Sequence, residues 1–169
     1  GFHTNAIYGF LNIFFNAYSK IQPDYVIVAF DVREKTFRHL MYEAYKGNRK
    51  GMPEELHEQV PVLKEVLQSM HIKTAELAGY EADDVIGTYA KMAEKEGTEV
   101  VILSGDRDLL QLASDTTLVA IPKTKSGMTQ IEYYYAKDVL DAYQVTPQEF
   151  IELKALMGDS SDNIPGIPG

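Results

Sequence analysis

The sequence predicts an α/β fold with a central, mostly parallel sheet flanked by helices. Short apolar runs rich in branched residues, at 25–30 (YVIVAF) and 99–104 (EVVILS), have the pattern of buried strands. Longer stretches between and after them carry apolar residues with the period of an α-helix. Strands that alternate with helices favour a parallel sheet with helices on its faces.

The first half of the chain is expected to contain two helices and a second strand besides the strand at 25–30. Apolar residues recur on a helical period at 6–21. Another helix is expected over 52–70, where Pro53 suits the first turn and Pro61 should kink or restart the helix. A short strand is expected at 72–77.

The second half of the chain is expected to continue the alternation of helices and strands. A helix over 82–97 should end at Gly97. The last helix should begin with Thr146 as its N-cap and Pro147 in its first turn. The other expected elements are a short helix at 107–113, two strands joined by a turn at 116–122 and 127–134, and helices at 136–144 and 146–158.

The composition is that of an ordinary globular domain of 169 residues with a net charge of −9. Cysteine is absent, which excludes a disulfide framework and a thiolate metal site. No run approaches the roughly 18 apolar residues of a membrane span, and no secretory signal is visible. We therefore expect a cytoplasmic protein that does not bind membranes.

The negative net charge alone argues against nucleic acid as a partner, but it hides a local reversal. Residues 33–50, here called the basic segment, hold six basic residues against two acidic ones, a local charge of +4. The six are Arg33, Lys35, Arg38, Lys46, Arg49 and Lys50. Charge this uneven indicates a binding surface beside an acidic pocket, although a solvated helix face is the alternative.

Carboxylates follow the expected strands at the points where ligands bind in α/β sheets. In four groups along the chain these are Asp31; Glu81, Asp83 and Asp84; Asp106 and Asp108; and Asp159 and Asp162. If the sheet is parallel, the first three groups should converge on one edge, and the fourth could return to it. Each group also has an ordinary explanation as a turn, a helix cap or a polar loop.

Taken together, so many carboxylates at one edge would repel each other unless cations offset their charge. Magnesium prefers oxygen ligands, and two such ions about 4 Å apart can clamp the reacting oxygens of a phosphodiester. The residues therefore favour a metal-dependent enzyme acting on phosphoryl groups or nucleic acid. A receiver-like phosphotransfer domain and a non-catalytic binding module are the alternatives.

Five motifs resemble, in order, those of the bacterial 5′–3′ exonuclease (flap endonuclease) family, which includes a domain of DNA polymerase I. They are AFDVREKTFRH, YEAYKGNRK, GYEADDVIGT, ILSGDRDLLQL and KALMGDSSDNIPGIPG. The resemblance implies a PIN-like fold with a helical gateway for the 5′ strand. It also implies two Mg²⁺ or Mn²⁺ ions and hydrolysis of DNA or RNA near a junction bearing a 5′ end, in replication and repair.

The resemblance also implies roles for individual residues, and among them Asp31, Lys46 and Asp106 would act in catalysis. Acids implied around the first metal are Asp31, Glu81, Asp83, Asp84 and Asp106. Those implied around the second are Asp108, Asp159 and Asp162, with Asp106 near both. Tyr45 would stack on a displaced base and Lys46 would touch the scissile phosphate. Residues implied to steer phosphates are Arg33, Lys35, Arg38 and Arg49.

Residues 1–157 are expected to form the catalytic domain, and 158–169 the beginning of a helix–hairpin–helix element. In that element Gly166 and Gly169 would hold duplex DNA with their backbone amides, together with a K⁺ ion. The implied partners are 5′-flapped or nicked DNA and RNA primers, bound by a monomer whose parent chain carries polymerase domains. The alternatives within this resemblance are a stand-alone nuclease and a non-catalytic DNA-binding module.

The sequence departs from the family pattern at both ends. Family members begin with an apolar strand that ends in a metal-binding Asp, and this chain begins with GFHTNAIYGF instead. The hairpin of the family continues beyond the point at which this chain stops. We therefore expect the 169 residues to be a fragment that is weak or inactive as a nuclease when isolated.

Overall fold

The computed structural model describes residues 1–125 and 128–168. Residues 126 and 127, in and beside the turn expected between two strands, and Gly169 lie outside this description. Its helices are α1 Asn5–Ile21, α2 Phe37–Met41, α3 Glu54–His57, α4 Gln59–Ser69, α5 Ala82–Lys95, α6 Ala136–Tyr143 and α7 Pro147–Met157, with a 3₁₀ helix, η1, at Arg107–Leu112. Its strands are β1 Ile27–Ala29, β2 Lys73–Ala75, β3 Val100–Leu103, β4 Thr117–Lys125 and β5 Met128–Tyr134.

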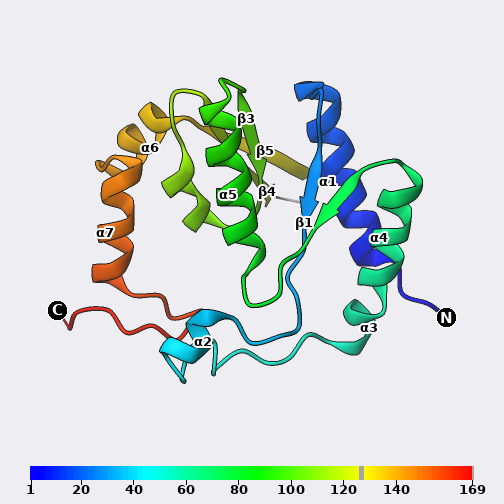
Figure 1. Cartoon of the computed structure of the whole chain (residues 1–169), viewed down its shortest axis with the longest axis horizontal. Coiled ribbons are helices and arrows are strands. Elements are labelled where there is room, and N and C mark those ends of the chain that lie inside the picture. The colour runs from blue at the N-terminus through cyan, green and yellow to red at the C-terminus, as the bar shows by residue number, and fades with distance from the viewer. Residues whose placement is uncertain (126–127, 169) are drawn as a thin grey trace.

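The elements form two groups joined through α5 (Figure 1). On one side, α1 and α4 lie beside β1 and β2, and on the other side β3, β4 and β5 lie with α6 and α7. Helix α5 contacts both β1 and β3. The segment that carries α2 crosses below both groups (Figure 1). The first turn of α5 therefore lies between the ends of the two groups of strands.

The α/β class is as predicted, but the single central sheet is not observed. Among the described residues, β1 and β2 form one parallel pair, and β3, β4 and β5 form a second sheet. Strands β4 and β5 are antiparallel, and two residues separate them in the sequence. The prediction that the run at 25–30 is buried is also wrong, since Ile27 is 45% exposed. Among the residues that the structure describes, β1 pairs with β2 alone.

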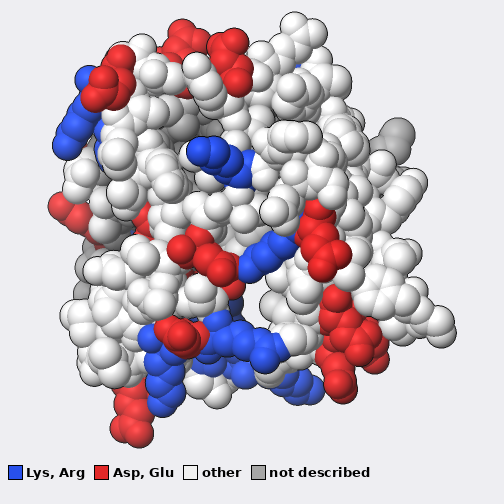
Figure 2. All heavy atoms as spheres, turned by 45° about the vertical axis from the view of Figure 1, so that its right-hand side comes forward, with Lys and Arg blue, Asp and Glu red and all other residues white. Residues whose placement is uncertain are grey.

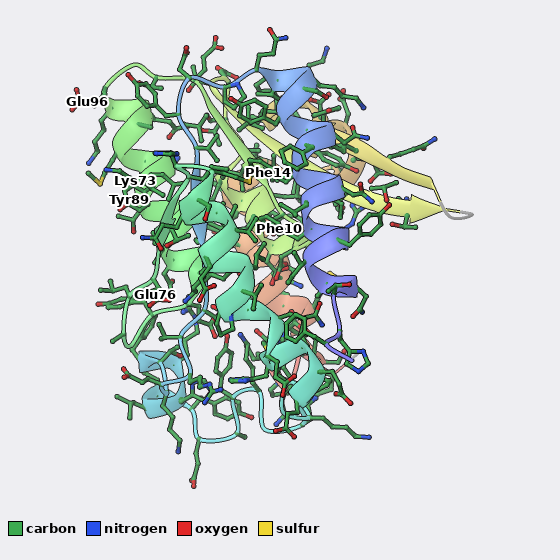
Figure 3. All side chains as sticks on the ribbon, turned by 90° about the vertical axis from the view of Figure 1, so that its right-hand side faces the viewer. Phe10, Phe14, Lys73, Glu76, Tyr89 and Glu96 are labelled. Atoms are coloured by element: carbon green, nitrogen blue, oxygen red, sulfur yellow. The ribbon has the colours of Figure 1, made fainter. Side chains whose placement is uncertain are left out.

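Each group of strands has its own hydrophobic core. The larger core packs η1, α5, α6 and α7 against β3 and β4, and Leu110, Val119 and Val139 are fully buried there. The smaller core joins α1 to α4 through Leu67 and its neighbours. Phe10 and Phe14 lie on one side of α1 (Figure 3), with ring centroids 6.0 Å apart. Burial of each large side chain stabilises the fold by roughly 2 kcal/mol.

Several helix boundaries fall where local signals placed them. The backbone N–H of Glu149 donates to the hydroxyl of Thr146 over 3.2 Å, which caps α7 as predicted. The long helix expected over 52–70 is interrupted at Glu58, between α3 and α4, so that Pro61 lies in the first turn of α4. Gly97 follows α5 with φ of +74°, the left-handed conformation typical of a helix end.

The basic segment is mostly irregular. Helix α2 contains five residues and is followed by turns at 43–48. In the part of the chain that the structure describes, no helix has the length and apolar character needed to cross a membrane.

Candidate functional site

The carboxylates that follow three of the strands lie together around the start of α5. Asp31, just after β1, accepts a hydrogen bond of 2.7 Å from the backbone N–H of Ala82. Asp83 is in the first turn of α5. Burial, and then the neighbouring charges of Asp106, Asp31 and Glu81, raise the pKa of Asp83 to about 6. Asp83 is therefore in a crowded site where negative charge is incompletely offset.

The raised pKa of Asp83 gives a prediction for stability against pH. Asp83 binds its proton more tightly in the folded state, where the pKa is about 6, than when unfolded, where it is about 4. The metal-free protein should therefore lose stability as pH rises from about 4 through about 6. In EDTA at pH 7.5, the Asp83→Asn variant should be about 1 kcal/mol more stable than wild type, after allowance for solvent screening. Urea denaturation at pH 4 and at pH 7.5 measures the free energy of unfolding of the variant and of wild type. An equal difference between the two proteins at both pH values would contradict this expectation.

Asp106 and Asp108 stand at the start of η1, directly beyond β3. Asp106 is the N-cap of this helix, since its Oδ1 accepts a hydrogen bond of 2.8 Å from the backbone N–H of Asp108. The local explanation of Asp106 as a cap is therefore correct. It does not exclude a second role, because Asp106 also acts on the pKa of Asp83.

Asp108 and Asp159 are joined by a lysine that sequence reasoning missed. The Nζ of Lys154, in α7, lies 2.9 Å from an oxygen of Asp108 and 3.3 Å from one of Asp159. The hydrogen bond to Asp108 is the main cause that raises the pKa of Lys154. The available signal was the position of this lysine in the last turn of α7, directly before the GDSSDN motif.

The loop at 158–164 places Asp159 and Asp162 beside the other acids. Asp159 accepts hydrogen bonds from the backbone N–H and the hydroxyl of Ser161, at 2.8 and 2.6 Å. These bonds and Lys154 lower the pKa of Asp159 to about 2. Residues Asp159 and Ile164 pair through their backbones, so that the loop closes on itself. Asp159 shares Lys154 with Asp108, and Asp162 shares the hydroxyl of Tyr45 with Glu81, so the fourth acidic group does return to the others.

Cations of the basic segment pair directly with these acids. Lys46 Nζ lies 2.6 Å from Glu81, and Arg49 pairs with Asp162. Arg38 binds both oxygens of Asp84, at 2.7 and 2.8 Å, and this contact is the main cause that lowers the pKa of Asp84. We call the carboxylates around the start of α5, at the start of η1 and in the 158–164 loop the acidic cluster. The basic segment is thus in direct contact with this cluster.

Tyr45 is not placed as its predicted role in base stacking requires. Its side chain is 5% exposed, and its ring packs edge-on against His39 at 5.1 Å. Its hydroxyl donates to Glu81 and to Asp162, at 3.0 and 3.1 Å. Burial and these carboxylates raise its pKa. In this conformation the ring is not available for stacking, because the phenol finds two acceptors that are distant in sequence, and the stacking role stays a prediction.

The remaining predicted nucleic-acid residues have mixed surroundings. Arg33 is exposed and contacts the ring of His57 at 3.0 Å, while Lys35 is exposed. Gly166 has a packing role, since a Cβ there would lie 2.2 Å from the carbonyl oxygen of Met157. Gly169 lies outside the described residues. Figure 2 shows Lys and Arg side chains gathered around a hollow whose sides carry Asp and Glu.

The donor set suits a hard divalent cation in kind, because every candidate ligand is a carboxylate oxygen. Within residues 1–125 and 128–168, however, no three or more such side chains are arranged to hold a metal ion. The carboxylates are instead neutralised by four basic side chains, those of Lys46, Lys154, Arg38 and Arg49. These ion pairs use carboxylate oxygens that a bound cation would otherwise contact.

Comparison with known proteins shows that the chain is similar to nuclease domains and to bacterial DNA polymerases. Residues 1–144 match the family described as 5'-3' exonuclease, N-terminal resolvase-like domain. DNA polymerase I of Bacillus subtilis (strain 168) is 51% identical over 169 residues, which is all of this chain and 19% of that protein. The chain thus spans about one fifth of the length of this relative.

Solved structures of a phage nuclease share the fold. The T5 D15 protein co-crystallised with metal ions is 27% identical, with a TM-score of 0.78 over 96% of this chain and 63% of that one. A pseudo-enzyme-product complex of the bacteriophage T5 D15 flap endonuclease, with DNA and metal ions, has a TM-score of 0.81 at 24% identity over 99% of this chain and 65% of that one. From the match over 144 of its residues, the chain belongs to the 5'-3' exonuclease, N-terminal resolvase-like domain family.

Proposed function

We propose that the protein containing this chain is a metal-dependent 5′–3′ exonuclease and 5′-flap endonuclease that cuts DNA and RNA primers in replication and repair. The observation that carries the proposal is the direct contact between a segment of charge +4 and carboxylates from two distant parts of the chain, Glu81 with Asp84 and Asp162. A polyanion and dications together would satisfy both sets of charges. Family membership and the relative named DNA polymerase I support this proposal.

The cofactors in this proposal are two Mg²⁺ or Mn²⁺ ions. The first would be held among Asp31, Glu81, Asp83, Asp84 and Asp106, and the second among Asp108, Asp159 and Asp162, with Asp106 near both. Bound there, such ions supply charge stabilisation at the phosphate and activation of water. The divalent metal ions (zinc) bound to the T5 5'-exonuclease, which is 28% identical to this chain, support a divalent cofactor.

The side chains of the chain itself have separate tasks in this proposal. Arg33 and Lys35, which are exposed, attract the phosphates of the incoming strand. Lys46, now on Glu81, turns to the scissile phosphate. Arg38 and Arg49 remain close enough to contact neighbouring phosphates once the carboxylates are engaged by metal.

The experiment that tests this function is cleavage of a labelled 5′-flap duplex by the full-length protein, with magnesium and with EDTA. We expect magnesium-dependent cutting, and binding that weakens steeply with salt. Replacement of Lys46 by Ala should slow the cut about 100-fold, because one positioned charge at the phosphate is lost. Lys73→Ala on β2, labelled in Figure 3, is the matched control and should cut at the wild-type rate. Equal rates with EDTA and magnesium would contradict the proposal.

The wider setting of this activity is also proposed. The parent chain carries polymerase domains, acts as a monomer and works at the nucleoid in the bacterial cytoplasm. Residues 1–157 form its catalytic unit, and 158–169 begin a helix–hairpin–helix element that takes K⁺ and holds duplex DNA through Gly166 and Gly169. The close backbone packing of Gly158 and Gly166 is compatible with such an element, because it leaves the loop compact.

A further inference from the structure

The second half of the basic segment is hydrogen-bonded to the loop at 159–163. Some of these hydrogen bonds join a side chain to the backbone, and one joins backbone to backbone. Asn48 Nδ2 donates to the carbonyl of Ser160 over 2.7 Å. Asn163 Nδ2 donates in the opposite direction, to the carbonyl of Ala44, over 2.8 Å. The backbone N–H of Lys46 donates to the carbonyl of Asp162 over 2.9 Å. Arg49 Nε also donates to the carbonyl of Ser161, over 3.0 Å. Two segments more than a hundred residues apart are therefore joined by four bonds to main-chain carbonyls.

The backbone at this junction is held in an unfavourable conformation. Lys46 has φ of +54° and Asn163 has φ of +60°, both in the left-handed region. Asparagine tolerates this region, but for Lys46 the conformation costs about 1 kcal/mol or more and persists only where surrounding contacts fix it. For Lys46 the fixing contact is the bond from its own N–H to Asp162. The position of the Lys46 side chain thus depends on the junction.

The bonds at the junction differ in how they respond to bound metal. Arg49 and Tyr45 contact the carboxylate of Asp162, and Lys46 contacts that of Glu81, so these contacts compete with any cation that binds the acids. The amides of Asn48 and Asn163 bind main-chain carbonyls and carry no charge. These two hydrogen bonds can persist while a bound cation replaces the charged contacts to Glu81 and Asp162.

We propose that Asn48 and Asn163 are positioning residues, which clamp the basic segment to the loop at 159–163 and keep Lys46 at the acidic cluster. The proposal rests on the function proposed above and assigns a purpose to two uncharged residues of the AYKGNR and GDSSDN motifs. Neither side chain touches the reacting phosphate. Both act by fixing the backbone that carries Lys46.

The clamp is tested by trypsin digestion of the full-length protein, with EDTA and with magnesium. Wild-type protein should resist cleavage after Lys46, Arg49 and Lys50 in both conditions. Asn48→Ala and Asn163→Gly should each speed cleavage there about fivefold, the effect of one lost hydrogen bond. Glycine at 163 keeps the left-handed backbone without strain. Asn163→Asp also tolerates this conformation but lacks the donor, and it should behave like Asn163→Gly.

Flap cleavage by the same variants separates positioning from a purely structural role. The kcat of Asn163→Gly should fall at least about fivefold, in proportion to the loss of the clamped state. Its KM should change less than twofold, because Arg33 and Lys35 still attract the strand. Asn48→Gln, which keeps an amide donor, should recover part of the loss caused by Asn48→Ala. Asn12→Ala, an exposed asparagine of α1, is the matched control for digestion and cleavage.

Trypsin rates equal to wild type in Asn163→Gly and Asn163→Asp would show that the asparagine does not hold the segment. Faster digestion with an unchanged kcat would show that the clamp does not position Lys46. If wild-type protein cuts no flap, the proposed function fails, while the trypsin rates still decide whether the clamp exists.

Discussion

Replacement of Asp106 by asparagine in the full-length protein should lower magnesium-dependent flap cleavage more than about 100-fold. Loss of a group that only hydrogen-bonds to a metal ligand already lowers metal affinity or activity 10- to 100-fold. Asp106 is proposed as a direct neighbour of both ions, so its loss should cost more. The side chain also caps η1 through the N–H of Asp108. Asparagine caps helices as well as aspartate, so the variant should fold normally. The loss should therefore appear in the rate at saturating substrate, with a denaturation midpoint in EDTA at neutral pH that is no lower than that of wild type, because the repulsion between Asp106 and Asp83 is removed.

Asp115→Asn is the matched control for this variant. Asp115 is an exposed aspartate between η1 and β4, outside the acidic cluster. It should cut at the wild-type rate. An Asp106→Asn variant with more than a tenth of wild-type activity would remove Asp106 from the proposed metal site.

Gly158→Ala should reduce flap cleavage at least about tenfold by distorting the loop that carries Asp159 and Asp162. A Cβ at this position would lie 2.2 Å from the backbone nitrogen of Gly166 and 2.6 Å from the carbonyl oxygen of Ile164. Atoms do not approach this closely, so the backbone must shift, and φ of +71° adds strain of about 1 kcal/mol. Both hydrophobic cores lie elsewhere, so the global fold should persist. Hydrogen exchange of the amides at 159–164 and the cleavage rate measure the two effects.

Gly97→Ala separates the clash from the strain. Gly97 has φ of +74°, close to that of Gly158, but a Cβ there would have no other atom within 4 Å. This variant should lose about 1 kcal/mol of stability and keep full activity. If Gly158→Ala and Gly97→Ala had equal activity, the close packing of the 158–164 loop would be irrelevant to the site.

Local chemistry predicted much of the fold. Thr146 followed by Pro147 marked the start of α7, Gly97 marked the end of α5, and the branched run before Ser104 marked β3. These signals work because a cap, a positive φ or a buried strand constrains residues that are adjacent in sequence. The division into two sheets was not predictable in this way, since it depends on which strands meet.

Ionic partners were the least predictable part of the site. The spacing of the acids suggested that they converge, and Asp31, Asp83 and Asp106 do lie together. Nothing in the sequence assigns Lys154 to Asp108, because the two are separated by most of the second half of the chain. The hydrogen bonds of Tyr45, which was predicted to stack on a displaced base, were missed for the same reason. Its hydrogen bond to Asp162 spans 117 residues and has no local signal.

The junction between the basic segment and the loop at 159–163 has a consequence for biosynthesis. Ribosomes deliver the amino-terminal part of a chain first, at about 5–20 residues per second. Because Asn163 reaches back 119 residues to Ala44, the two segments cannot meet until nearly all of this chain has left the exit tunnel. A nascent polypeptide therefore cannot form this junction, or fix the backbone of Lys46 through it, until the residues up to Asn163 have been synthesised and released.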